Sequence, residues 1–493
     1  MQPKKPVVYT IIDGMSVEAL EQTIHAGDAP ALSFIKEHAG YVRDSVAVFP
    51  TITPAATASL VTGATPAEHR IPGMCWYDRE TNRFVNYGQS PRAAVIEGIG
   101  QVVEDALTNM NCKHLSKDVS TIHETLDKLG VATASINFMC FRGPYTHELK
   151  PNILEKLILR NKLPDSLPGP KEHYFADVIK GPADACSDGL PKRGLTKRIQ
   201  ATDGYAACVT RGLLGKKAAG MIVFYLHEND HSSHNEGPSV QIESLAKADE
   251  HVAYVLDTFG SWEATLDQVE FVVTADHSQS PISDREDHIL DLTEVLGDFS
   301  NVKPERGKEH FEGRDVACAG NGRVAFFYLN EDRRISLLEP VVATLLNADG
   351  IDQIMWRDDD EYVVESDRGT LRFWEGGSSP VVDERDNKWS FSGELGVLSG
   401  VMEEGRMRTP EYPLAMWRIK NALDLDRMGD IVATMKLTYE CKDLAGGDHR
   451  GGGDHASLHV QDSIIPFMST LEDPPLRPSS VDVVPHIVRH FER

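Results

Sequence analysis

Continuous apolar runs constrain the fold of this chain more than any other feature of its sequence. Residues 7–12, 221–226 and 269–274 are apolar or β-branched at almost every position, which is typical of strands buried on both faces of a sheet. Helical patterns alternate with these runs along the chain. We therefore predict an α/β fold with a largely parallel central sheet and helices on both of its faces.

The helical patterns fall between the predicted strands, as the crossovers of a parallel sheet require. One helix is predicted at residues 16–25, with Ser16 as its N-cap residue. Further helices are predicted at 29–38, 121–129, 203–218 and 240–259, and further strands at 41–49 and 131–138.

A chain of 493 residues is too long for one ordinary core, and two stretches depart from the alternation. Residues 78–200 combine charges, prolines and patchy periodicity, which predicts an irregular insertion within the core. Residues 283–440 mix strand patterns with one helical pattern and acidic turns, which predicts an inserted α+β cap or substrate lobe over the carboxyl edge of the sheet. The catalytic core would then consist of residues 1–282 and 441–493.

The net charge limits the partners that the chain can have. A formal charge of -25 at pH 7 argues against a nucleic-acid polymer or an anionic membrane surface as the main partner. An anionic substrate would need local positive charge in so acidic a protein, and bound metal cations would supply it. The acidic run at residues 358–361 is interpreted as a solvated turn rather than as such a metal site.

The cysteines and residues 1–6 give an expectation about the cellular compartment of the protein. The seven cysteines are scattered and never have CxxC spacing, which predicts reduced structural thiols. Residues 1–6 lead into a short apolar run, with neither a signal-peptide pattern nor a stretch long enough to span a bilayer. We therefore expect a cytoplasmic location and no membrane partner, and leave the oligomeric state open.

Polar residues with catalytic potential follow the predicted strands, at the edge where parallel sheets bind ligands. Asp13 follows the first strand, and Thr53 follows an apolar run that ends at Phe49. A small-residue helix is predicted to begin there, with Pro54 in its first turn. The Thr53 hydroxyl would lie beside unpaired N–H groups that suit a phosphate-like anion. A Thr-Pro pair by itself is more often only an N-cap.

Three further segments supply possible metal ligands. Asp230 and His234 are four residues apart, so one helical turn would aim both side chains at one ion. Asp276 and His277 directly follow a predicted strand, where a tight turn would bring both toward one ion. A glycine-rich segment adds His455, since glycine lets the backbone approach an ion closely.

Together these segments provide six ligands and one hydroxyl group. Two metal ions about 4 Å apart can clamp the attacking and leaving oxygens of a phosphoryl transfer and activate a hydroxyl nucleophile. Taken singly, the segments have plainer interpretations as surface turns and flexible links. The complete set is Asp13, Thr53, Asp230, His234, Asp276, His277 and His455.

Five motifs recur in the order and spacing of a known family. In them the sequence resembles the alkaline phosphatase superfamily, and within it the type I phosphodiesterase/nucleotide pyrophosphatase group. The resemblance covers roughly residues 6–78, 218–282 and 441–470. The motifs are Ile11-Ile12-Asp13-Gly14, Phe49-Pro50-Thr51-Ile52-Thr53, Asp230 to His234, Ala275-Asp276-His277-Ser278 and Gly453-Asp454-His455-Ala456-Ser457.

The resemblance implies an alkaline phosphatase-like fold and a role for each candidate residue. Thr53 would be the nucleophile and would bridge two divalent metal ions, with zinc as the first choice and manganese as the second. One ion would be held by Asp13, Asp276 and His277, and the other by Asp230, His234 and His455.

The function that the resemblance implies is hydrolysis of a small-molecule phosphate ester. A phosphodiesterase or nucleotide pyrophosphatase is the first expectation. The alternative is a phosphomonoesterase, or a phosphonate hydrolase of the phosphonoacetate type, with the same metal centre.

The sequence departs from the family pattern close to the nucleophile. Many nucleotide pyrophosphatases place Lys before the nucleophile and Phe-Pro-Asn-His after it, whereas this chain has Ile52 and the residues 54–57. The Asn that helps to hold a phosphoryl oxygen in that group is missing, and Asn137 is the candidate substitute for substrate binding. His449 competes with His455 as a ligand, and the Asp-His-Ala-Ser-Leu context favours His455.

Overall fold

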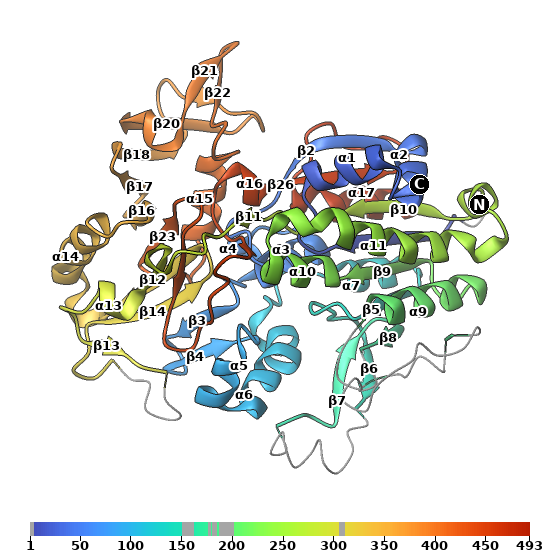
Figure 1. Ribbon diagram of the computed structural model, residues 1–493, viewed down its shortest axis with the longest axis horizontal. Coiled ribbons are helices and arrows are strands. Elements are labelled where there is room, and N and C mark those ends of the chain that lie inside the picture. The colour runs from blue at the N-terminus through green and yellow to red at the C-terminus, as the bar shows by residue number, and fades with distance from the viewer. Residues whose placement is uncertain (1–3, 150–161, 176–178, 180–184, 187–201, 305–310) are drawn as a thin grey trace.

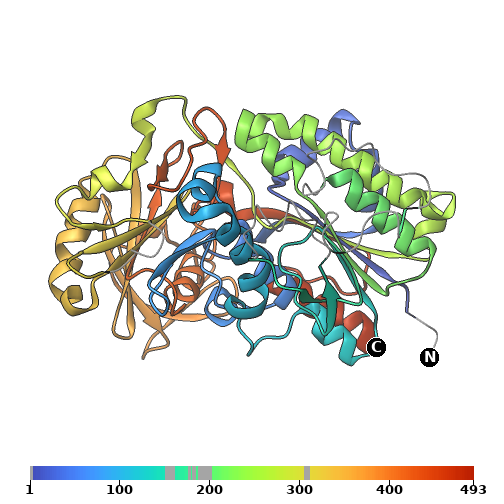
Figure 2. The same ribbon diagram turned by 90° about the horizontal axis from the view of Figure 1, so that it is seen from below.

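The computed structural model describes residues 4–149, 162–175, 179, 185–186, 202–304 and 311–493. Two large sheets lie at opposite ends of the molecule, with helices and loops between them (Figures 1 and 2). One of the sheets is largely parallel and is covered by helices on both faces, so the predicted α/β class is confirmed.

The central sheet contains the apolar runs predicted to be buried strands. Among the described residues it has seven strands, in the order β2-β26-β10-β1-β9-β5-β8. All neighbouring pairs are parallel except those made by β26, which is antiparallel to β2 and β10. The strands are β1 (Val7–Ile12), β2 (Gly40–Val46), β5 (Thr133–Ile136), β8 (Glu172–Tyr174), β9 (Met221–Leu226), β10 (Glu270–Thr274) and β26 (Ile464–Ser469).

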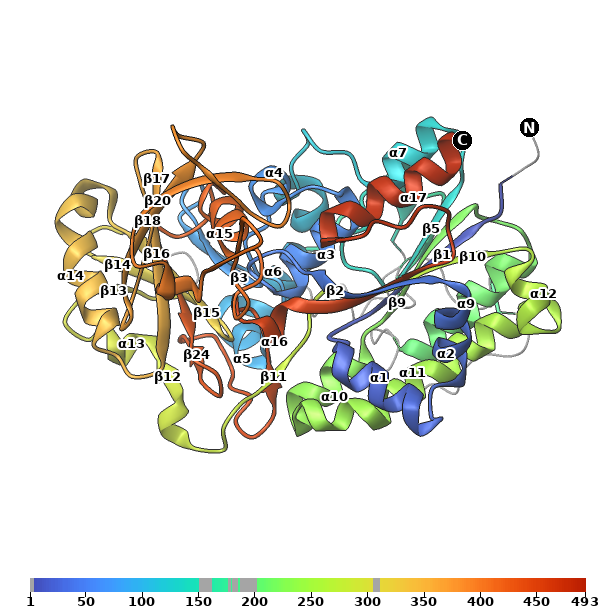
Figure 3. The same cartoon turned by 90° about the horizontal axis from the view of Figure 1, so that it is seen from above.

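Helices cover both faces of this sheet because successive strand residues point to opposite faces. In β1, Val7, Tyr9 and Ile11 pack into one apolar cluster, and Val8 and Ile12 pack into another. The first cluster is covered by α3 (Thr53–Thr62), α7 (Ile122–Lys128) and α17 (Val483–Glu492) (Figure 3). The second is covered by α1 (Val17–Ala26), α2 (Pro30–His38), α9 (Asp203–Gly215) and α11 (Gln241–Leu256).

A second, mostly antiparallel sheet is built from the stretch predicted to be an inserted lobe. Among the described residues it has eleven strands, and α14 (Arg334–Leu346) packs on it. The acidic run at residues 358–361 forms the turn between two of these strands, as the sequence predicted. The lobe boundaries at 283 and 440 stay predictions. The strands are β13 (Asn301–Val302), β14 (Val316–Asn321), β15 (Val324–Leu329), β16 (Ile351–Asp358), β17 (Glu361–Ser366), β18 (Gly369–Glu375), β19 (Val381–Val382), β20 (Lys388–Gly393), β21 (Val401–Glu403), β22 (Arg406–Arg408) and β23 (Ile431–Met435).

The two sheets are joined by continuous apolar packing and by a buried ion pair. One apolar cluster runs from Tyr9 of β1 to Phe326 of β15. Arg323, next to β15, donates from Nη1 to both carboxylate oxygens of Asp462 at 2.7 and 2.6 Å, and both side chains are fully buried. The Arg323 main-chain N–H also donates to the His455 carbonyl oxygen at 3.0 Å. The second sheet therefore helps to fix the loop that carries a candidate ligand.

The stretch 78–200 contains more regular structure than predicted. It supplies β8 to the central sheet, and it holds most of two hairpins, β3 (Cys75–Asp78) with β4 (Arg83–Asn86) and β6 (Tyr145–Glu148) with β7 (Ser166–Gly169). The predicted strand at 41–49 is shorter in the structure, since β2 ends at Val46 and the chain then leads to α3. Residues 150–161, 176–178, 180–184 and 187–201 of the predicted insertion lie outside the described residues.

The expectation that all seven cysteines are reduced is wrong for one pair. Cys186 and Cys208 form a disulfide with their Cα atoms 5.4 Å apart. Their separation of 22 residues carries no motif, so the pairing could not be predicted from spacing. The free thiols are Cys75, Cys112, Cys140, Cys318 and Cys441.

Within the described ranges, none of the helices combines the length and the apolar character that a membrane span needs.

Candidate active site

The candidate functional residues meet at the carboxyl edge of the central sheet. Asp13 directly follows β1, and Asp276 and His277 lie just after β10. Because β1 and β10 are parallel neighbours, these side chains come from adjacent strand ends. The His277 Nε2 atom lies 3.3 Å from Asp13 Oδ1 and 3.4 Å from Asp276 Oδ2.

The helix α10 (Glu228–Glu236) follows β9, the other parallel neighbour of β1. Asp230 and His234 are one turn apart on this helix, and Asp230 Oδ2 lies 3.2 Å from His234 Nε2. Their side chains therefore point to the same place.

Thr53 is the first residue of α3, and Ile52 before it supplies no side-chain cap. Within the described structure, the first N–H groups of this helix therefore lack a capping side chain and form the positive end of its dipole. The Thr53 Oγ1 atom lies 3.1 Å from His277 Nε2. A hydroxyl group in this position lies beside a surface that suits a phosphoryl anion.

His455 reaches the same place from a distant part of the chain. It follows β25 (Gly453–Asp454), which pairs with β11 (Ser280–Pro281) just after β10. The imidazole ring of His455 stacks on that of His277 with 3.5 Å between centroids, and its Nε2 lies 3.9 Å from Asp230 Oδ1. The structure thus brings all seven residues of the predicted set into one cluster.

The three histidines of this cluster present the same ring nitrogen to its centre. The Nδ1 atom of each contacts a main-chain carbonyl oxygen: Gly453 O at 2.8 Å from His234, Ser278 O at 3.1 Å from His277, and Thr51 O at 2.6 Å from His455. A carbonyl oxygen only accepts, so Nδ1 carries the proton and Nε2 keeps a free lone pair. This arrangement is typical of histidines that bind metal ions.

The carboxylates of the cluster also fit a metal ion. Asp13 Oδ1 and Asp276 Oδ2 are buried and have no hydrogen-bond partner in the described part of the chain. Leaving a buried acceptor unpaired costs about 1–3 kcal/mol, and more for a charged group. Their distances to His277 Nε2 are close to the roughly 3.3 Å between two ligands of a tetrahedral ion with bonds near 2.0 Å. The donors therefore suit a divalent cation that binds imidazole and carboxylate.

Burial and crowded charge shift the pKa values in the cluster. Burial, followed by the charge of Asp230, raises the pKa of Asp276 to about 6. Burial and the charge of Asp276 raise the pKa of Asp13 well above its usual value. Burial acts in the same direction on Asp230, but the facing histidines outweigh it and lower that pKa. Burial and His277 lower the pKa of His455 to about 4, so its ring is neutral at pH 7 and able to bind a cation.

Two supporting residues were not predicted from the sequence. The Tyr225 hydroxyl group donates to Asp13 Oδ2, and Gln279 Nε2 donates to Asp230 Oδ1. Tyr225 lies inside an apolar strand pattern, and Gln279 lies beyond the Asp-His-Ser motif. The one signal for both was their position near strand ends at the carboxyl edge.

A second group of acidic and imidazole side chains borders the cluster. Glu440 of β24 (Glu440–Lys442), His449 and Asp454 offer ligand atoms that all lie within 4.8 Å of one another. Burial lowers the pKa of His449, but the carboxylates of Asp454 and Glu440 outweigh this effect and raise it to about 11. His449 thus faces Glu440 and Asp454, whereas His455 lies beside Asp230.

Asn137, predicted to bind substrate, follows β5 at the same edge of the central sheet. Its φ angle is 55°, and its main-chain N–H donates to the Tyr174 carbonyl oxygen at 2.9 Å. A role for its side chain in substrate binding stays a prediction.

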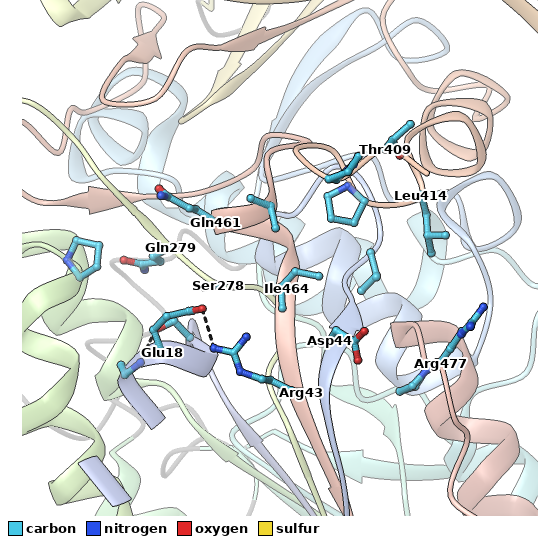
Figure 4. Close-up of a pocket in the computed structure, with 18 of the residues that line it drawn as sticks. Glu18, Arg43, Asp44, Ser278, Gln279, Thr409, Leu414, Gln461, Ile464 and Arg477 are labelled. Carbon is cyan, nitrogen blue, oxygen red and sulfur yellow. Dashed lines mark hydrogen bonds and ion pairs between the residues drawn. The ribbon is translucent and has the colours of Figure 1, made fainter. Parts of the chain in front are cut away.

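A cavity of about 740 Å³ borders the turn that follows β10. Ser278 and Gln279 of this turn line it, together with Ile464 of the central sheet and Thr409 from the segment after β22 (Figure 4). None of the seven cluster residues is among its described lining residues. Gln279 therefore lines this cavity and also donates a hydrogen bond to Asp230.

A sequence profile described as type I phosphodiesterase / nucleotide pyrophosphatase matches residues 7–457. The match includes every residue of the cluster and the described strands of both large sheets except β26.

Solved structures of low sequence identity share the fold. Murine ectonucleotide pyrophosphatase / phosphodiesterase 5 has 15% identity and a TM-score of 0.56, and the match covers 99% of this chain and 95% of that one. An inactive variant of the same murine protein, in complex with AMP, has 15% identity and a TM-score of 0.55, with the same coverage. Phosphonoacetate hydrolase from Sinorhizobium meliloti 1021, in complex with phosphonoformate, has 17% identity and a TM-score of 0.57, covering 99% of this chain and 96% of that one.

Proposed function

The chain belongs to the type I phosphodiesterase / nucleotide pyrophosphatase family, and on this premise we propose that it is a two-metal phosphodiesterase with Thr53 as its nucleophile. Hydrolysis of phosphoesters is the activity common to this family. One observation carries the finer proposal: the Thr53 hydroxyl lies 3.1 Å from His277 Nε2, at an uncapped helix N-terminus inside a cluster of possible metal ligands.

Two divalent ions would be held by the cluster, beside the Thr53 hydroxyl group. When bound, they would lower the pKa of the Thr53 hydroxyl and neutralise charge on the transferring phosphoryl group. Three imidazoles and three carboxylates favour Zn²⁺ over Mn²⁺. The first ion would be held by Asp13, Asp276 and His277, and the second by Asp230, His234 and His455.

The reaction would take place in two displacement steps at phosphorus. In the first, the Thr53 hydroxyl gives up its proton to solvent and its oxygen forms a bond to phosphorus. The bond to the leaving-group oxygen breaks, and the leaving group takes the electron pair and a proton from solvent. The N–H groups at the start of α3 stabilise the charge that develops on the phosphoryl oxygens. In the second step, water attacks the phosphothreonine, which restores the hydroxyl group and releases a phosphomonoester.

A phosphonate or a phosphomonoester is the second candidate substrate. Ile52 stands where many nucleotide pyrophosphatases have a lysine, so this chain lacks one contact expected for a nucleotide. A phosphonoacetate hydrolase is among the solved structures with this fold. A cytoplasmic location and the absence of a nucleic-acid partner stay predictions from the sequence.

The substrate class can be tested with three compounds and the zinc-loaded protein. We expect kcat/KM for bis(p-nitrophenyl) phosphate to exceed that for p-nitrophenyl phosphate and for phosphonoacetate by about tenfold or more, a difference of at least 1.4 kcal/mol in transition-state binding. A preference for the monoester or for phosphonoacetate would contradict the phosphodiesterase proposal and support the second candidate.

Gln279 is expected to position Asp230 for metal binding. Without its amide, Asp230 Oδ1 loses a hydrogen-bond donor, and we expect Gln279→Ala to lower zinc affinity by about 10–100-fold. The control is Gln461→Ala, because Gln461 lines the same cavity and is exposed. Zinc affinities from competition with a chromophoric chelator provide the measurement. Equal affinities for Gln279→Ala and the parent protein would contradict this role.

A further inference from the structure

We propose that Glu440, His449 and Asp454 form a third metal site next to the dinuclear centre. None of these residues belongs to the two ligand sets proposed above. Two carboxylates and one imidazole would take a divalent cation, with Zn²⁺ as the first choice. The inference depends on the geometry of these three side chains and holds whether or not Thr53 is the nucleophile.

The three side chains converge from separate parts of one segment. Glu440 begins β24, Asp454 ends β25, and His449 lies in the glycine-rich loop between them. His449 Nδ1 lies 3.0 Å from Glu440 Oε2 and 3.7 Å from Asp454 Oδ2. These distances, with all three ligand atoms within 4.8 Å of one another, suit three donors on one side of a single cation.

One oxygen of Asp454 lacks a partner that an ion would supply. Asp454 is 3% exposed, and its Oδ2 atom has no hydrogen-bond partner among the described residues. Glu440 is 1% exposed, so two buried carboxylates share one imidazole, and a divalent ion would displace the imidazole proton and bring two charges instead of one. The imidazole of His449 is too far from Asp454 Oδ2 for a normal hydrogen bond. A divalent ion would contact both carboxylates.

The surrounding main chain holds the carboxylates in place. The His449 main-chain N–H donates to Glu440 Oε1 at 2.5 Å, which leaves Oε2 facing the imidazole. Gly322 has a φ angle of +64°, and a Cβ atom there would lie 2.1 Å from Asp454 Oδ2, so only glycine leaves room for this carboxylate. The His449 side chain is 33% exposed, which gives an ion access from solvent.

The third site would lie directly beside the dinuclear centre. Asp454 directly precedes His455, and its Oδ1 atom lies 3.9 Å from His234 Nδ1. The imidazole rings of His234 and His449 lie 4.2 Å apart. An ion held by the new site would therefore add positive charge beside the ion proposed for Asp230 and would anchor the loop that carries His455.

Metal stoichiometry tests this proposal. The full chain is dialysed to equilibrium against buffered free Zn²⁺, and bound zinc is measured by elemental analysis. We expect three equivalents for the parent protein, two for Glu440→Gln and one for the double variant Asp230→Ala/Glu440→Gln. Asp448→Asn, which changes an exposed carboxylate of the same loop, is the matched control and should keep three.

Two equivalents in the parent protein would overturn the third site, and so would three equivalents in both Glu440→Gln and His449→Ala. His449→Ala is the second variant because its half-buried ring can be removed with less risk to folding, and melting curves establish that each variant is folded. Loss of zinc from Asp230→Ala but not from Glu440→Gln would support the dinuclear centre and contradict the third site. Retention of two equivalents in the double variant would contradict the assigned ligands.

Discussion

Replacing Thr53 with alanine is expected to abolish turnover of phosphate esters while leaving the fold and the bound metal largely intact. Enzymes that depend on a nucleophile lose about 10⁴-fold or more in kcat when it is removed. The six aspartate and histidine ligands remain in Thr53→Ala, so the metal content should change little. Alanine is also well tolerated in a helix, so the start of α3 should remain folded.

Turnover of bis(p-nitrophenyl) phosphate and elemental analysis of the same samples provide the two readouts. Thr53→Ser keeps a hydroxyl group in the same position and should retain measurable turnover. Thr62→Ala is the matched control, because Thr62 lies at the other end of the same helix. Near wild-type activity in Thr53→Ala would exclude Thr53 as the nucleophile. Acid quenching during turnover, followed by mass spectrometry of the peptide that carries Thr53, tests the phosphothreonine directly.

The buried strands of the central sheet could be predicted because burial on both faces leaves a local pattern. β1 and β9 are fully buried, so nearly all of their residues are apolar. β8 has no such pattern, since it is a short edge strand of Glu, His and Tyr. The pairing of β26 with β10 and β2 joins residues far apart in the chain, which a local pattern cannot record.

The candidate ligands could be predicted for a related reason. Asp13 and Asp276 directly follow buried strands, and a parallel sheet brings such strand ends together. Tyr225 was not predicted, because a tyrosine within an apolar run resembles a core residue in everything but its position near the strand end. Its hydroxyl group reaches Asp13 only through the register that pairs Ile11 with Tyr225. Glu440 could not be predicted either. It lies at the predicted lobe boundary, and only the folded chain brings its carboxylate close to that of Asp454.

Asp230→Ala is expected to remove one metal ion and most of the activity. Asp230 faces both histidines of its proposed ion, with Oδ2 3.2 Å from His234 Nε2 and Oδ1 3.9 Å from His455 Nε2. Without this carboxylate, two imidazoles remain of the three side chains assigned to this ion. We therefore expect one metal equivalent fewer than in the parent protein, and a fall in kcat of roughly 10³-fold, or about 4 kcal/mol.

His231→Ala is the matched control, because its exposed ring lies on the same helix outside the cluster and should leave metal content and turnover unchanged. A full metal complement with normal turnover in Asp230→Ala would contradict the second ligand set. Loss of one ion with turnover retained would separate metal binding from catalysis. In that case the chemistry would depend on the ion held by Asp13, Asp276 and His277, since His277 Nε2 lies 3.1 Å from the Thr53 hydroxyl.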